Sequence, residues 1–400
     1  MPLPFAGLRV VDLTSVLSGP FCTYQLALLG ADVIKIEQPG VGDLSRGLGA
    51  DDGLNGAGMG AMFLAQNAGK RSLTLNLKAE RGRALFRRLA ARADVLVENF
   101  RPGVMERLGL GAETLRAEHP GLIYCAISGF GQESPYRDNP AYDQIIQGLS
   151  GAMSTTGDAT TPPLRAGYPV GDTAGGMAAA FAIAAALFQR GRTGQGQVID
   201  VALLDTMLVM MGWVASNWTV AGQRPQRLGN DNSIASPSGA FRTADGFLNI
   251  AANSQGQFEE LCGALGLPDL PRDPRYGDRP GRIAHRGALK AALEGVLVTR
   301  ASADWETALN AAGIPAGRVL GLDEALSHPH VRARELLVRF ADVPGVGRPF
   351  EILTTGIKLS GGGPEVSRRP PTLGEHTDEV LRELGVAEDE ARALRAQGVV

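Results

Sequence analysis

Short apolar runs alternate with segments of helical periodicity through the first half of the chain. One such helical segment is 79–92, where Ala84, Leu85 and Leu89 fall on a single face. Strands that alternate with helices in this way form βαβ units. We therefore predict an α/β fold with a large Rossmann-like domain and a mainly parallel sheet. The expected strands are residues 8–13, 32–36, 72–77, 94–98 and 122–127.

The pattern changes after a stretch rich in Pro, Asn, Ser and Gly at 223–239. Two short strands at 240–243 and 247–251 flank a turn, which indicates a hairpin, and helical patterns follow. The last part of the chain is rich in Gly and Pro. We predict a large domain at 1–225, a smaller α+β domain at 226–325, and a C-terminal segment at 326–400 that returns to the large domain.

Composition narrows the classes of protein. Lys and Arg total 39 against 42 Asp and Glu, a net charge of −3, which does not fit a nucleic-acid binder. The three cysteines and five histidines are scattered, so we expect neither a disulfide framework nor a metal site. The N-terminus lacks a signal-peptide pattern, and the longest apolar run, 177–188, is too short to cross a bilayer. We expect a cytoplasmic globular protein that does not bind a membrane.

The segment 167–188, GYPVGDTAGGMAAAFAIAAALF, places one acid before a helix of small residues. At the N-cap, Asp172 would accept N–H bonds from the first turn, and the helix dipole would keep it ionised. Gly171, Gly175 and Gly176 would leave room for a bulky substrate. An ionised, accessible carboxylate can act as a covalent nucleophile. From these residues alone, the alternative is that Asp172 only caps a packed helix.

A set of cations in the first 110 residues could hold a phosphorylated ligand as point charges. The alternative is ordinary solvated loop charge. The segment 99–103 follows an expected strand, and ligands bind at the carboxyl ends of strands in open α/β sheets. No GxGxxG follows the first strand, so the sequence gives little support to a nicotinamide-binding site. The cations are Lys35, Lys70, Arg71, Lys78, Arg101 and Arg107.

In their order and spacing, several segments together resemble the family III CoA-transferases, a group that includes formyl-CoA transferase and the carnitine CoA-transferases. The resemblance covers nearly the whole chain, and it implies the α/β fold of that family, assembled as an interlocked homodimer. The segments that carry it are 17–20 (LSGP), 30–37 (GADVIKIE), 70–73 (KRSL), 97–103 (VENFRPG), 128–131 (SGFG), 171–172 (GD), 191–197 (GRTGQGQ) and 373–377 (LGEHT).

The resemblance implies that Asp172 is the family's nucleophile. Its carboxylate would attack an acyl-CoA to give a mixed anhydride, and CoA thiolate would convert this to an aspartyl-CoA thioester. A small carboxylic acid, with dicarboxylates among the options, would then take the CoA. The glycines beside Asp172 would leave backbone N–H groups free for the developing oxyanion. Arg46 and Arg165 are candidates to pair with a second carboxylate of the acceptor.

The resemblance also implies which residues contact coenzyme A. Gln38 replaces an Arg near the nucleotide, Pro140 replaces a Lys of some relatives, and Leu17 replaces a Gln in the acyl pocket of formyl-CoA transferase. The change at Leu17, with another at 248–256, argues against exchange between formyl and oxalyl groups. The implied contacts are Val16, Leu17, Ser18, Gln38, Leu75, Lys78, Asn99, Phe100, Arg101, Arg107, Asn139, Ala141 and Tyr142.

Two other functions stay open. The same fold hosts α-methylacyl-CoA racemases, which carry a His followed by an Asp where this chain has Tyr142 and Asp143. Tyrosine, whose ordinary pKa is about 10, is a poor base at neutral pH, so the sequence favours transfer over racemisation. A non-catalytic acyl-CoA-binding protein is the second alternative, and the intact Gly171–Asp172 pair argues against it.

Overall fold

The computed structural model describes residues 1–400, which divide into two compact units. The first comprises Met1–Ala152, Arg165–Gln223 and Arg332–Val400, and the second comprises Met153–Leu164 and Arg224–Val331. The main break at 223/224 lies two residues from the expected one at 225/226. The short segment Met153–Leu164 also belongs to the second unit, which the sequence did not indicate.

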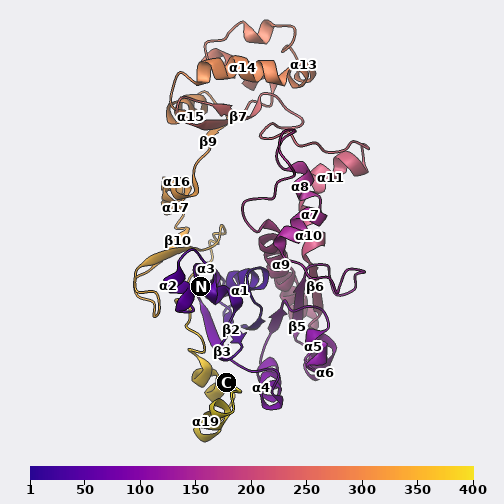
Figure 1. Ribbon diagram of the computed structural model, residues 1–400, viewed down its shortest axis with the longest axis vertical. Helices are drawn as coiled ribbons and strands as arrows, with labels where there is room; N and C mark the ends of the chain where they lie inside the picture. The colour runs from indigo at the N-terminus through magenta and orange to yellow at the C-terminus, as the bar shows by residue number, and fades with distance from the viewer. The chain divides into compact units, whose positions relative to one another are not determined.

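The first unit is built on a six-stranded sheet of order β3-β2-β1-β4-β5-β6, in which all paired strands are parallel (Figure 1). This is the strand order of a Rossmann fold, and the order in which strands are added to the sheet reverses between β1 and β4. The predicted α/β class is therefore confirmed, and five strands fall where apolar runs were seen. The strands are β1 (Arg9–Leu13), β2 (Asp32–Glu37), β3 (Lys70–Thr74), β4 (Val95–Glu98), β5 (Ile123–Ser128) and β6 (Val198–Ala202).

Helices cover both faces of this sheet because its strands are apolar on both sides. Leu85 and Phe86 of α4 pack on one face, together with Val380 of α18. Cys22 and Leu26 lie on α1 and pack on the other, with α9. The helices of the unit are α1 (Ser18–Leu28), α2 (Asp52–Gly56), α3 (Ala61–Asn67), α4 (Glu80–Ala90), α5 (Val104–Arg107), α6 (Ala112–Glu118), α7 (Asp143–Leu149), α9 (Val170–Thr193), α10 (Leu203–Met210), α11 (Gly212–Thr219), α18 (Thr377–Glu383) and α19 (Glu388–Ala396).

Helix α9 is long and apolar enough to cross a membrane, judged by length and composition alone. In the structure its small residues lie against α1, β5 and β6, and Ala179 and Ile183 are fully buried. This burial is what the core helix of an α/β domain requires. The remaining small elements of the unit are the 3₁₀ turn Leu44–Gly47 and the antiparallel pair β10 (Leu337–Phe340) and β11 (Phe350–Leu353).

The second unit holds the predicted hairpin as part of a three-stranded antiparallel sheet, β7-β8-β9. Its helices bury an apolar core that includes Phe241, Phe258 and Trp305. The elements are β7 (Ser238–Arg242), β8 (Phe247–Ala251), β9 (Ala316–Arg318), α12 (Gln255–Ala264), the 3₁₀ turn Leu270–Arg272, α13 (Arg279–Ala284), α14 (Arg286–Leu297), α15 (Ser302–Ala311) and α16 (Leu322–Ser327). Helices α8 (Ala152–Thr155) and α17 (Pro329–Ala333) lie where the chain passes between the units.

Candidate active site

Asp172 lies in the first turn of α9, not at its N-cap. The helix begins at Val170, with Pro169 in the N-cap position and no side-chain cap from within the helix. The N–H groups of Gly171 and Asp172 instead donate to Oδ1 of Asp143, at 2.7 and 3.4 Å. Asp143 on α7 therefore does the capping that the sequence assigned to Asp172.

The Asp143 side chain is itself held in place by a neighbour on the same helix. It is buried, and Gln147, one turn along α7, donates from Nε2 to Asp143 Oδ2 at 2.6 Å. The Oε1 atom of Gln147 accepts the N–H of Ala166 at 2.8 Å, which ties the segment before α9 to α7. This role of Asp143 was not predicted from the sequence. The only local signal was the spacing of Asp143 and Gln147 by four residues, which places them on one helix face.

The environment of Asp172 makes it a weak acid. Burial, and after it the charge of Asp143, raises the pKa of the Asp172 carboxyl to about 7. The sequence predicted a carboxylate held ionised by the helix dipole, and the structure corrects this. The Asp172 side chain accepts no hydrogen bond from the protein, so its ionised form has no internal partner to restrain it as a nucleophile.

The backbone N–H groups around Asp172 are occupied. Those of Gly171 and Asp172 go to Asp143, and those of Val170 and Thr173 go to the carbonyls of Tyr168 and Pro169. The expectation that these groups stay free for an oxyanion was therefore wrong, and donors to a developing negative charge must come from elsewhere.

The two glycines after Asp172 serve helix packing. A Cβ on Gly176 would lie 2.4 Å from the carbonyl oxygen of Ser18 on α1, and one on Gly175 would lie 2.1 Å from Leu203 Cδ2 on α10. Both glycines thus let neighbouring helices approach α9 closely. This corrects the expectation that they make room for a substrate.

Most of the expected CoA contacts line one of two cavities of the first unit. The larger has a volume of about 380 Å³, and the smaller of about 210 Å³. Phe100 lines both cavities, so it forms the wall that they share. The larger is lined by Gln38, Leu75, Lys78, Phe100 and Arg107, and the smaller by Asn99, Phe100, Arg101, Asn139, Ala141 and Tyr142.

These cavities have the mixed lining that a nucleotide thioester needs. In the larger one, Leu75 and Phe100 offer apolar surface to a base, while Lys78 and Arg107 offer charge to phosphates. Arg137, which the sequence analysis did not single out, lines the smaller cavity beside Pro140. It supplies a cation close to the position where Pro140 removes one.

Asp172 itself lines neither cavity, and its link to the smaller one runs through α7. Tyr142 lines that cavity and precedes Asp143, whose carboxylate contacts the backbone of Asp172. Val16, Leu17 and Ser18 line neither cavity; they form the end of the loop from β1 and the start of α1. Their neighbours Thr14 and Ser15 line the larger one.

Three of the expected phosphate-binding cations are structural instead. Lys35 and Lys70 are fully buried and pair with Asp43 and Asp12, at 2.8 and 3.0 Å. Arg71 is buried too and pairs with acids of β2 and α18. None of the three side chains is free for a ligand, which corrects that part of the prediction.

Arg46 is likewise engaged. Its Nε and Nη2 atoms donate to the two carboxylate oxygens of Glu37 at 2.7 and 2.8 Å, and its side chain is buried. It therefore cannot receive an acceptor carboxylate. Arg165 has an exposed side chain.

Comparison with known proteins gives a consistent result. A family model described as CoA-transferase family III matches residues 5–377. Succinate–glutarate CoA-transferase of Agrobacterium fabrum is 39% identical over 96% of each chain. Acetyl-CoA:oxalate CoA-transferase of Acetobacter aceti is 42% identical over 87% of this chain and 89% of its own. A crystal structure of a CAIB/BAIF family protein from Brucella suis superposes with a TM-score of 0.84 at 36% identity, over 96% of this chain and all of that one.

Proposed function

The chain belongs to CoA-transferase family III and is a CoA-transferase, and we propose that Asp172 is its nucleophile. One observation carries this proposal: the Asp172 carboxylate has no hydrogen-bond partner of its own, while Asp143 holds its backbone. The next residue to Asp143, Tyr142, lines a cavity with Asn99 and Arg101. The Asp172 side chain thus has no internal hydrogen bond, and the residue that holds its backbone follows one that lines a cavity suited to a CoA ester.

The reaction then proceeds by exchange of acyl bonds without net proton transfer. An Asp172 oxygen attacks the thioester carbon, the C–S bond breaks, and CoA thiolate and a mixed anhydride form. The thiolate attacks the Asp172 carbonyl and releases the donor acid, which leaves an aspartyl-CoA thioester. The acceptor carboxylate attacks this thioester and releases thiolate again. The thiolate finally attacks the acceptor's carbonyl in the second anhydride, which yields the new acyl-CoA and regenerates Asp172.

We propose a dicarboxylic acid as the acceptor. The relatives named above act, by their names, on succinate and glutarate or on oxalate. The similarity to an oxalate enzyme means that the substitution at Leu17 does not by itself argue against oxalate. A second carboxylate needs a cation, and Arg165 is the one of our two candidates that is not already paired with Glu37.

We also propose that the enzyme is a homodimer, interlocked as the family resemblance implies. Large apolar side chains stand exposed on three successive helices: Phe181 and Phe188 on α9, Val209 on α10, and Trp213 on α11. These helices pack in series, α9 on α10 and α10 on α11, and exposed apolar side chains that cluster mark interaction surfaces. A second copy of the chain would remove them from water.

Mass spectrometry of the intact protein tests the chemistry. Wild type and Asp172→Ala are mixed with succinyl-, glutaryl-, acetyl- and oxalyl-CoA, and adducts are trapped with hydroxylamine or borohydride. We expect a modification on the peptide that contains Asp172, absent from the variant. When succinate, glutarate or oxalate is added as the acceptor, we expect CoA to be transferred to at least one of these acids. Deuterium exchange at an α-carbon without an adduct would instead indicate a racemase. The absence of both an adduct and deuterium exchange would indicate a non-catalytic binding protein.

A further inference from the structure

The loop from β1 to α1 carries a strained residue. Val16 has φ 70°, in the left-handed region that β-branched side chains rarely adopt. Such a conformation persists only where its surroundings enforce it, and it is concentrated at functional sites. The loop comprises Thr14, Ser15, Val16 and Leu17, and we call it the β1–α1 loop.

This loop lies between the two parts of the proposed active site. On one side, Thr14 and Ser15 line the larger cavity. On the other, the carbonyl of Ser18, which follows the loop directly, contacts α9 at Gly176. Asp172 is one helical turn before Gly176 and lies on the same face of α9. The loop therefore links the wall of the larger cavity to the face of α9 that carries Asp172.

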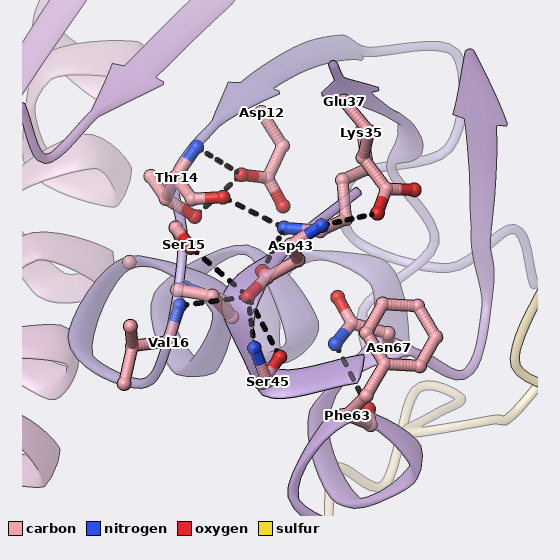
Figure 2. A network of polar contacts seen from close by, with 12 residues as sticks. Asp12, Thr14, Ser15, Val16, Lys35, Glu37, Asp43, Ser45, Phe63 and Asn67 are labelled. Carbon is pink, nitrogen blue, oxygen red and sulfur yellow. Dashed lines mark hydrogen bonds and ion pairs between the residues drawn. The ribbon is translucent and has the colours of Figure 1, made fainter. Parts of the chain in front are cut away.

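Side chains from outside the loop hold its backbone (Figure 2). Asp12 Oδ1 accepts the Thr14 N–H at 2.9 Å, and Lys35 Nζ donates to the Thr14 carbonyl at 2.7 Å. Asn99 accepts the Ser15 N–H and donates to the Ser15 carbonyl, both at 2.9 Å. Every polar backbone group of these two residues is thus held by a side chain that is distant in sequence or buried in the sheet.

Asp43 holds the strained residue itself. Its Oδ1 accepts the Val16 N–H and the Ser15 hydroxyl, both at 3.0 Å, and also two bonds from Ser45 at 2.8 Å (Figure 2). Its Oδ2 pairs with Lys35 Nζ at 2.8 Å, and both side chains are almost completely buried. Burial alone would raise the pKa of Asp43, but Lys35 and these hydrogen bonds hold it well below its usual range. The Val16 N–H therefore meets a full negative charge, which makes a stronger hydrogen bond than a neutral acceptor would.

We propose that Asp43 is a positioning residue for the reaction: through its hydrogen bond to Val16, and fixed by Lys35, it keeps the β1–α1 loop in the strained path that presents the thioester to Asp172. The inference rests on the proposed function of Asp172. Asp43 Oδ1 also caps the 3₁₀ turn Leu44–Gly47 through Ser45, but neither this cap nor the ion pair needs the bond to Val16. Asp43 makes this bond while Lys35 holds the carbonyl two residues earlier.

The test is Asp43→Asn, alone and combined with Val16→Gly. In Asp43→Asn the Lys35 cation attracts the amide oxygen, so the NH₂ group turns toward the Val16 N–H. An NH₂ group cannot accept this hydrogen bond, and the bond that holds Val16 is lost. We expect kcat and the rate of adduct formation at Asp172 to fall about 100-fold, because small misplacements of reacting groups have effects of this size. KM for the acyl-CoA should change far less. Glycine adopts a positive φ without strain, so Val16→Gly should recover at least about tenfold of the lost kcat.

Asp94→Asn is the matched control. Asp94 also pairs with a cation, Arg190, and accepts a backbone N–H, that of Arg9, but it does so at the amino end of the sheet. The Asp94→Asn substitution should lower the stability of the protein and leave kcat unchanged. Hydrogen exchange adds a readout that does not depend on activity. The Val16 amide should lose protection in Asp43→Asn, while amides in the β1 and β2 strands keep theirs.

The outcomes separate this inference from the proposed function. Wild-type kcat in a folded Asp43→Asn variant, or no recovery in a folded double variant, would overturn the positioning role. Where Asp43→Asn does not fold, Val16→Pro decides, because it excludes a positive φ and leaves the buried charges in place. A loss of kcat in Val16→Pro supports the inference, and normal kcat overturns it. A wild-type protein that forms no adduct would overturn the function of Asp172, and loss of Val16 protection in Asp43→Asn would still support the hold of Asp43 on the loop.

Discussion

The Asp172 carboxyl combines two properties that suit a nucleophile in acyl transfer. Its pKa lies close to neutral pH, and it accepts no hydrogen bond from the protein. Because only the ionised form attacks, its rate of adduct formation should depend on pH. With a pKa raised to about 7 by burial and by Asp143, the rate should be constant above that pH and fall roughly tenfold per pH unit below it. Stopped-flow mixing with a reactive acyl-CoA between pH 5.5 and 8.5 measures it. A flat profile would contradict this assignment of the pKa.

The charge of Asp143 contributes to that shift, so Asp143→Asn should move the midpoint of the profile to lower pH. The asparagine oxygen can still accept the Gly171 N–H, although the bond from Gln147 to Oδ2 is lost. We expect a modest loss of stability together with faster adduct formation at pH 6. Asp389→Asn, which removes the same charge from the exposed start of α19, is the control. An equal shift in both variants would show that net charge, and not Asp143, sets the profile.

The raised pKa of Asp172 should also make the free energy of unfolding depend on pH. The ordinary pKa of an Asp side chain, 3.8, applies in the unfolded chain, whereas the pKa of folded Asp172 is raised to about 7. Between these values the folded state binds more protons, so the free energy of unfolding falls as pH rises, and the full cost is present above 7. Asp172→Asn removes this cost and should stabilise the protein by about 2 kcal/mol at pH 8. Urea unfolding should show a smaller gain at pH 5, and an equal gain at both pH values would contradict the origin in ionisation.

The role of a residue could be predicted from the sequence only where it depends on neighbouring residues in the chain. Asp172 stands out because an acid beside glycines opens a helix of small residues. The capping by Asp143 could not be foreseen, because it depends on the first turns of α7 and α9 meeting in space. The buried cations were misassigned, although Lys35 lay inside a predicted strand. A lysine flanked by Ile34 and Ile36 in a central strand must be buried, and a buried charge needs an internal partner.

At the scale of the elements, α9 depends on how closely α1 can approach it. A Cβ at position 176 would lie 2.4 Å from a backbone oxygen of α1, which cannot move without shifting that helix. Gly176→Ala should therefore destabilise the protein by about 1–3 kcal/mol and slow adduct formation, since α1 begins at the strained loop. Gly191→Ala on the same helix meets no atom within 4 Å and should be neutral or slightly stabilising. Equal effects of the two changes would refute the packing argument.

The elements themselves were largely readable because the central strands are buried on both faces and appear as unbroken apolar runs. The strand at the edge, β6, was not predicted. Its first three residues, from Val198 to Asp200, are exposed or half-buried, so they carry no continuous apolar signal. The segment Met153–Leu164 was assigned to the large domain for a related reason. Its place in the second unit comes from contacts such as that of Arg227 with Asp158, which are distant in sequence.

At the scale of the whole molecule, the exposed apolar side chains of α9, α10 and α11 are the feature that a single chain leaves unexplained. Trp213 is 77% exposed and Phe181 is 76% exposed. Burial of surface of this kind is the main driving force of stable association between protein chains. We therefore expect a dimer by mass photometry at all accessible concentrations. A monomer throughout would contradict the proposed assembly.

An interlocked dimer makes a stronger prediction than an ordinary one. Two chains that thread each other cannot separate without unfolding, so the exchange of subunits must be as slow as unfolding itself. Tagged and untagged enzyme, mixed and followed by native mass spectrometry, should form hybrid dimers only at the rate at which each unfolds. Urea should accelerate exchange and unfolding in parallel. Hybrids that form quickly on dilution, under conditions where the protein stays folded, would show two chains that pack side by side on the same apolar helices without threading.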